Sequence, residues 1–334
     1  MNKNYGIFGL AIQSDEATPA ASPAVLFAAS EGSDGMDANT STEGVRLTIG
    51  GRDTTVNRYI SGSENTFNAT TLAFADVLGL LLKAALGEDT VSGSAAPYTH
   101  DVKGGESIPA VTVWQQVGAS NAAVQRMDAC KVDELSISME GTQPPAVEMS
   151  LAGTKMQWLS ATAMPGGGSF DPTAGWYLTA GAEVLFSLAD GTPVATPATV
   201  DLQSLAISIA NNLEASTRLG EVDPARQTEG AADVTVDISG TTSDTALYRQ
   251  VKTGSAAGTE LSGTIVTGSL QVTLAHSVED WSLVIKLPAI PWTIEPMEVD
   301  PEGGNFDLSL STEGALAVDG SACEFIIQNG VASY

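Results

Sequence analysis

The stretches Leu135-Ser-Ile-Ser-Met139 and Val147-Glu-Met-Ser-Leu151 alternate apolar and polar side chains residue by residue. Such alternation places the apolar side chains on one face of a β-strand and the polar side chains on the other. The same pattern returns along the whole chain, at residues 45–49, 111–114, 205–209, 234–238, 281–287 and 324–327. The sequence therefore predicts an all-β protein of mainly antiparallel sheets, each with one covered and one solvated face.

Two segments depart from this alternation and predict short helices packed on the sheets. Residues 71–87 are rich in Leu and Ala, begin beside threonines that suit a helix N-cap, and end at Gly87. Their leucines fall broadly on one side, as expected for an amphipathic helix that covers a sheet. Residues 243–252 also begin with capping residues and are followed by Gly254.

The positions of these two helices suggest an internal duplication. In each half of the chain, strands precede a helix that ends at glycine, and further strands follow. The Gly- and Pro-rich segment between the halves has the composition of a linker. We therefore expect a β domain over residues 1–160, a linker over 161–175, and a second, duplicated β domain over 176–334. Because residue identity between the halves is low, two merely similar sheet domains are the alternative.

Charge is distributed very unevenly in this sequence. The chain contains 14 Lys and Arg residues against 40 Asp and Glu residues, a formal net charge of −26. No Lys or Arg follows Lys286, although that last stretch is rich in carboxylates. A protein of this charge should repel nucleic acid, because DNA binding depends on Lys and Arg that replace phosphate counterions. The simpler interpretation is a generic acidic surface that keeps the protein soluble.

No constellation of residues indicates a catalytic, cofactor-binding or metal-binding site. His100 and His276 each occur alone in a strand-like context, and we expect surface or turn histidines. Cys130 and Cys323 lie far apart, so we expect buried free thiols. The acidic residues 31–43 lack the ligand order of a calcium-binding EF-hand and predict a solvated loop. We find neither a signal peptide nor a segment long enough to cross a membrane, so the sequence predicts a soluble, non-enzymatic protein.

An ordered series of motifs covers residues 71–158. It consists of Leu80-Leu-Leu-Lys-Ala-Ala-Leu-Gly87, Tyr98-Thr-His-Asp101, Glu106-Ser-Ile-Pro-Ala-Val-Thr-Val113, Met127-Asp-Ala-Cys-Lys-Val-Asp-Glu-Leu-Ser-Ile-Ser138 and Pro144-Pro-Ala-Val-Glu-Met-Ser-Leu-Ala-Gly153. In order and spacing this series resembles the major tail tube proteins of bacteriophages with long, non-contractile tails. Leu205-Ala-Ile-Ser-Ile-Ala-Asn-Asn-Leu213 and Leu287-Pro288 extend the resemblance over most of the chain.

The resemblance implies a structural virion protein that assembles with copies of itself. Its rings would stack into a tail tube lined by β-strands, assembled in the host cytoplasm, with a helix packed against the outer side of the sheet. The implied partners are the tape measure protein and the tail terminator and baseplate proteins. Double-stranded DNA would pass through without specific binding, because acidic side chains in the channel repel phosphate. The acids that we expect to line this channel are Glu134, Glu148, Asp233 and Asp237.

The resemblance also bears on the size of the ring and leaves other functions open. Single-domain members of the family form six-fold rings, so a chain with two tube domains implies a trimer with pseudo-six-fold symmetry. A true hexamer would follow if the second domain were an outer decoration. The alternative functions are another virion component, such as a minor tail or head-decoration protein, and a secreted carbohydrate-binding or adhesive β-domain protein.

Overall fold

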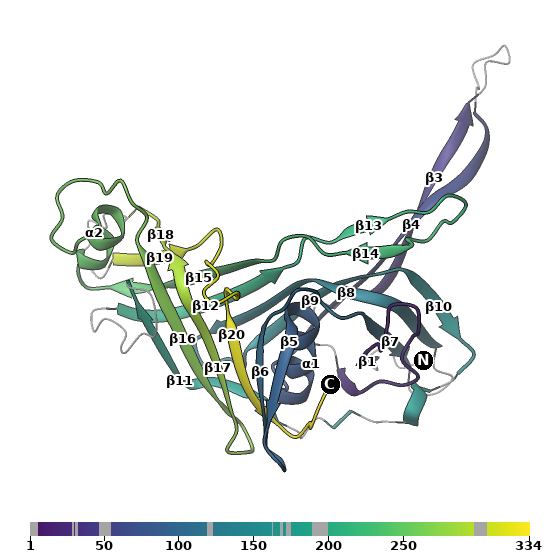
Figure 1. The fold of residues 1–334 in the computed structure, drawn as a ribbon, viewed down its shortest axis with the longest axis horizontal. Helices are drawn as coiled ribbons and strands as arrows, with labels where there is room; N and C mark the ends of the chain where they lie inside the picture. Colours follow the sequence, from purple (N-terminus) through teal and green to yellow (C-terminus); the bar gives the residue numbers. More distant parts are fainter. Residues whose placement is uncertain are drawn as a thin grey trace.

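The computed structural model describes residues 6–28, 30, 33–46, 55–118, 123–161, 163–167, 170–171, 175–188, 200–296 and 306–334. The chain folds mainly into antiparallel β-sheets with two short α-helices (Figure 1), which confirms the predicted fold class. The predicted strands occur, except that residues 47–49 of the first lie outside the described residues. None of the helices in the described ranges is long and apolar enough to cross a membrane.

The largest sheet, here called the main sheet, combines strands from both halves of the chain. Ile137 lies opposite Val147 on one side and Ile207 on the other, and all three are buried, so the alternation of the sequence sets the pairing register. All neighbours are antiparallel, in the order β3 (Gly35–Arg46), β4 (Thr55–Leu72), β9 (Ala146–Gly153), β8 (Ala123–Glu140), β12 (Val200–Ala210), β15 (Asp233–Thr242), β19 (Phe306–Ser311) and β18 (Thr293–Ile294).

Two further sheets complete the body of the molecule. The side sheet shares β8 with the main sheet and contains β2 (Val25–Ala28), β1 (Gly6–Ile12), β7 (Val111–Val117) and β10 (Lys155–Leu159). The back sheet has the order β11 (Tyr177–Ser187), β16 (Thr267–His276), β17 (Ser282–Pro291), β20 (Glu324–Asn329), β6 (Tyr98–Gly104) and β5 (Gly87–Ser92). The remaining elements are the hairpin of β13 (Glu214–Ser216) and β14 (Arg226–Thr228) and a 3₁₀ turn at Pro165–Gly167.

Helix α1 (Ala75–Leu86) lies between the sheets, in contact with β8 of the main sheet and with β5, β6 and β20 of the back sheet. The helix begins later than predicted, because residues 71–72 belong to β4 and pair with β9. It is also not amphipathic: apart from Asp76 and Lys83, every residue is buried, as expected for a helix that is apolar all round. Both helices end at glycine as predicted, α1 at Gly87 and α2 (Ala246–Thr253) at Gly254.

One hydrophobic core runs through the three sheets and surrounds α1. Cys130 and Cys323 are free and buried within it, as expected. Burial raises the pKa of the Cys323 thiol to about 12, so this thiol is unreactive at neutral pH.

Strands β3 and β4 extend beyond the body as a two-stranded ribbon, here called the arm (residues 39–46 and 55–64; Figure 1). Within the described residues this part of β4 pairs with β3 alone, because its pairing with β9 begins at Asn65. The hairpin of β13 and β14 runs beside the base of the arm, where the Ser63 hydroxyl donates a hydrogen bond to Asp223 Oδ1 at 2.5 Å. The loop predicted at residues 31–43 is wrong, because residues 35–43 belong to β3; residues 31–32 lie outside the described residues.

Candidate functional site

The four acids singled out in the sequence lie on one face of the main sheet. Glu134 on β8 and Asp233 on β15 lie opposite Ala210 from its two sides. Glu148 on β9 lies opposite Ser136, which is on the same side of β8 as Glu134. Asp237 follows Asp233 on the same side of β15. Because directly opposed residues share a face, all four carboxylates point away from the core, on a surface that we call the acid face.

The alternation along each strand produces this arrangement. On β15, Val234, Val236 and Ile238 are buried, while Asp233 before them and Asp237 among them are exposed. The outward neighbours of the acids on adjacent strands are Ser, Thr and Ala, so no two acids lie directly opposite each other. This spacing avoids the most repulsive cross-strand pairs while the face keeps a single sign of charge.

Hydrogen bonds on the acid face come from neutral groups. The Ser208 hydroxyl donates to Glu134 Oε1 at 2.9 Å, and Asn212 Nδ2 donates to Asp233 Oδ2 at 3.1 Å. Such donors orient a carboxylate without neutralising it. The strand segments that form the face contain no Lys or Arg at residues 64–72, 134–140, 146–150, 204–210, 233–241 and 307–311. The negative charge of this face is therefore uncompensated.

Sequence reasoning missed further acids on the same face. Glu140 lies on β8 opposite Ser204, and Asp307 lies on β19 opposite Thr241. Glu140 follows Glu134 by an even number of residues on one strand, so the alternation alone could have identified it. Asp307 could not be placed in this way, because its position depends on the pairing of β19 with β15, which no local pattern reveals.

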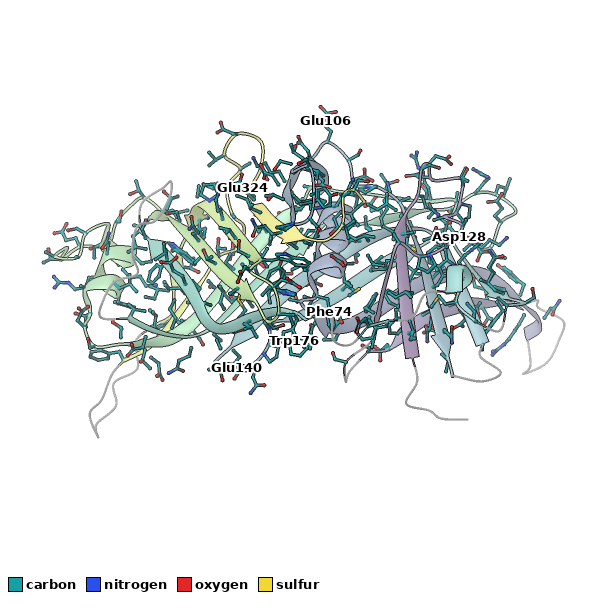
Figure 2. All side chains as sticks on the ribbon, turned by 90° about the horizontal axis from the view of Figure 1, so that it is seen from below. Phe74, Glu106, Asp128, Glu140, Trp176 and Glu324 are labelled. Carbon is teal, nitrogen blue, oxygen red and sulfur yellow. The ribbon has the colours of Figure 1, made fainter. Side chains whose placement is uncertain are left out.

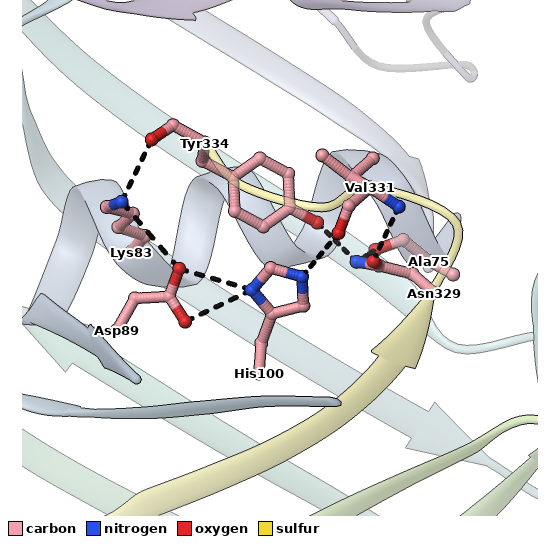
Figure 3. Close-up of polar contacts among 7 residues, drawn as sticks. All are labelled: Ala75, Lys83, Asp89, His100, Asn329, Val331 and Tyr334. Atoms are coloured by element: carbon pink, nitrogen blue, oxygen red, sulfur yellow. Dashed lines mark hydrogen bonds and ion pairs between the residues drawn. The ribbon is translucent and has the colours of Figure 1, made fainter. Parts of the chain in front are cut away.

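Both histidines differ from the expectation of surface or turn residues, because His276 is buried and His100 is buried more deeply. Instead of lying at the surface it is fully buried, with Nδ1 at 3.1 Å from Asp89 Oδ1 and Nε2 at 2.8 Å from the carbonyl oxygen of Val331 (Figure 3). Lys83 of α1 donates to the carbonyl oxygen of Tyr334 at 2.9 Å, and the Tyr334 ring packs on the imidazole. These contacts fasten residues 329–334 to α1, which is a structural role.

The chemistry available on the acid face is electrostatic. In the described ranges no group of three or more His, Cys, Asp or Glu side chains is placed to hold a metal ion. His276 is also buried, with Nδ1 accepting a hydrogen bond from the backbone N–H of Glu279 at 3.1 Å. Burial lowers the pKa of His276, so the imidazole is neutral at physiological pH. What the acid face presents to its surroundings is a field that attracts cations and repels polyanions.

Comparison with known proteins identifies the family of this chain. A family model described as phage tail tube protein matches residues 8–316, nearly the whole chain. A search of curated proteins finds no match. Because the family match covers both halves of the main sheet and both helices, the chain belongs to the family of phage tail tube proteins, structural components of the virion tail.

Proposed function

We propose that this chain is the subunit of a tube that conducts the phage genome, and that the acid face lines the channel. The observation that carries the proposal is a broad sheet surface with several acids, formed by strand segments that contain no Lys or Arg. DNA that passes through such a channel finds no Lys or Arg to replace its counterions, so it has no place to bind. The tube belongs to a long, non-contractile tail that is assembled in the host cytoplasm.

We further propose a ring of three copies with pseudo-six-fold symmetry, in which residues 1–160 and 176–334 are two tube domains. The strand order of the main sheet supports this duplication. Along the sheet, the first half supplies β3, β4, β9 and β8, and the second half supplies β12, β15, β19 and β18. In each set the first two strands come before the helix in the sequence, and the last two come after it.

The elements between these strands correspond as well. In the first half α1 is followed by the β5–β6 hairpin, and in the second half α2 is followed by the β16–β17 hairpin; both hairpins belong to the back sheet. The first strand pair carries the arm, and its counterpart β12–β15 carries the β13–β14 hairpin. Two such units in one chain make three copies equivalent to six single-domain subunits.

Closure of the ring also accounts for the edges of the main sheet. Strands β3 and β18 stand at its two ends, each paired on one side within the described part of the chain. Pairing between neighbouring copies would convert these open edges into a closed barrel and remove a route to aggregation. At the ends of the tube we expect tail terminator and baseplate proteins, and inside it during assembly the tape measure protein.

Electron microscopy of the purified chain tests the assembly, with hollow tubes of three-copy rings as the expected result. The lining is tested in a variant with Glu134→Lys, Glu148→Lys, Asp233→Lys and Asp237→Lys. Tubes of this variant should retain double-stranded DNA at low salt and release it as salt rises, and phage carrying it should eject DNA slowly. The matched control changes back-sheet acids, Glu88→Lys and Glu183→Lys, and should retain none. Tubes of the first variant that hold no DNA at low salt would refute the lining.

A further inference from the structure

A cavity of about 490 Å³ opens beside the first turn of α1, on a different part of the molecule from the acid face. Three aromatic rings and three carboxylates line it: Phe74, Phe170, Trp281, Asp76, Asp171 and Glu279. Phe74 and Phe170 pack edge to face with ring centroids 5.2 Å apart, and Trp176 also packs edge to face on Phe74, as their neighbouring positions in Figure 2 show. Ring contacts therefore hold Phe74 and Phe170 in place, and the Trp281 ring packs against His276.

The chemistry of this cavity suits a positively charged side chain. Aromatic faces and carboxylates both attract cations, and the attraction grows where water is displaced. Asp76 Oδ1 is buried and accepts no hydrogen bond from the described residues. Burial raises the pKa of Asp76, so a cation brought close to it would relieve the cost of keeping this carboxylate ionised.

Few basic side chains of the described residues are available to fill such a site. Ion pairs occupy Lys83, Lys103, Arg126, Lys131, Arg218 and Lys286. Arg249 donates to the carbonyl oxygen of Gly258, and Lys252 lies over the Tyr248 ring. The basic side chains for which the described residues provide no such partner are Arg58, Lys155 and Arg226.

Among these three, Arg58 stands out because it lies on the arm. Tyr59 and Ile60 follow it and are each 50% exposed, although both are large and apolar. The Tyr59 hydroxyl donates to Glu43 Oε2 at 2.8 Å across the ribbon, which fixes the ring at the surface. Arg58 and the exposed Ile60 share one face of the ribbon, and such a pair of a cation and an apolar side chain matches a cavity of carboxylates and aromatic rings.

The arm cannot reach the cavity of its own chain. Figure 1 shows that the arm leaves the body on the side away from the end of the chain, and Val331 near that end lines the cavity. A contact between the two surfaces must therefore join different copies. It would be a head-to-tail contact between unlike surfaces, the kind that propagates a stack of subunits.

We propose that the arm of one copy inserts Arg58 into the aromatic and acidic cavity at the start of α1 in a neighbouring copy. This rests on the proposed tube, since the contact exists only between assembled copies. Glu279 is exposed at the edge of the cavity and is the carboxylate that Arg58 meets first, while Asp76 lies deeper. Ile60 lies two residues after Arg58 and therefore on the same face of the ribbon, so its apolar side chain packs against the rings, while Tyr59 points to the opposite face.

A charge exchange tests this contact through the protein concentration at which tubes form. Arg58→Glu and Glu279→Lys should each raise that concentration about tenfold or more, because each places like charges together. The double variant Arg58→Glu/Glu279→Lys should restore assembly toward that of the unmodified chain. The matched controls are Arg226→Glu and the adjacent Asp280→Lys, which should leave assembly unchanged. Circular dichroism of each variant establishes that it is folded.

The outcomes separate this inference from the proposed function. If the unmodified chain forms no tubes, the proposed assembly fails. If it forms tubes and both single variants assemble at the same concentration as the unmodified chain, the Arg58 contact is refuted. The contact is also refuted if the single variants are impaired and the double variant assembles no better than they do. As a direct measurement, the pair Arg58→Cys and Glu279→Cys should give chains cross-linked between copies when tubes are oxidised, and either cysteine alone should not.

Discussion

The back sheet and the main sheet both present polar side chains outward, but they arrange charge differently. On the back sheet Glu88, Lys103, Glu324 and Lys286 lie directly opposite one another on successive strands, so acids and bases alternate. On the acid face, acids alternate with Ser, Thr and Ala. Figure 2 shows Glu324 of the back sheet and Glu140 of the acid face on opposite sides of the molecule.

The ion pairs of the back sheet are short. Glu324 accepts hydrogen bonds at 2.9 Å from both Lys103 and Lys286, and Lys103 also lies 3.1 Å from Asp101. Burial alone would raise the pKa of Glu324, but the two lysines outweigh it and the pKa is lowered. This difference between the sheets shows that the net charge of −26 is not spread evenly over the surface of the protein. The row on the back sheet pairs each acid with a lysine, whereas the acid face keeps an uncompensated negative field.

The largest expected effect on the free energy of unfolding comes from removing Lys131, whose charge two glutamates already neutralise. Lys131 lies on β8, but its ammonium is bound by Glu229 at 2.6 Å and Glu16 at 2.9 Å, and these bonds raise its pKa although burial opposes them. Lys131→Met would leave both acids unpaired, so we expect a loss of about 2 kcal/mol in the free energy of unfolding. Urea unfolding of unassembled protein measures it.

The control for this variant is Lys155→Met, which removes an exposed lysine of the neighbouring strand β10. Its unfolding free energy should change by less than about 0.5 kcal/mol. Equal urea midpoints for the two variants would show that Lys131 is not bound by Glu229 and Glu16. Lys131 would then be free to compensate the charge of the acid face, and the contrast in charge between the two sheets would be weaker than described.

The features that the sequence predicts are those that depend on residues close together in the chain. The strand of residues 135–139 and the end of α1 at Gly87 follow from local patterns, and so does the placement of each acid on the polar side of its strand. The alternating row of Glu88, Lys103, Glu324 and Lys286 could not be foreseen, because it joins strands far apart in the chain. The burial of α1 could not be predicted either, because the sheets that surround the helix bury it on all sides whatever the periodicity of its own residues.

The second prediction concerns the centre of the balanced row. Glu324→Gln should cost about 1 kcal/mol at neutral pH, since it leaves two partly exposed lysines without their carboxylate. Because the folded pKa of Glu324 is lowered, its contribution is present above the unfolded value of about 4.3 and is lost as pH falls through the folded pKa. Thermal unfolding from pH 7 to pH 3 should therefore show the variant and the unmodified chain converging in acid. A difference that grows as pH falls would contradict the pairing.

The smallest expected effect has the opposite sign and tests the acid face directly. Asp237 is exposed and forms no ion pair within the described residues, and Ala206 and Ser311 lie opposite it. Its charge only adds to the repulsion among the other acids, so Asp237→Asn should stabilise unassembled protein by about 0.3 kcal/mol at low salt. The gain should disappear in about 1 M salt, where the screening length falls to about 3 Å from about 30 Å at 0.01 M. Glu324→Gln, measured in parallel, should destabilise at low salt, so the two faces are distinguished by sign even where the magnitudes are small. If Asp237→Asn destabilised the protein at low salt, a cation would have to lie near it, and the acid face would not be the uncompensated surface that lines a channel.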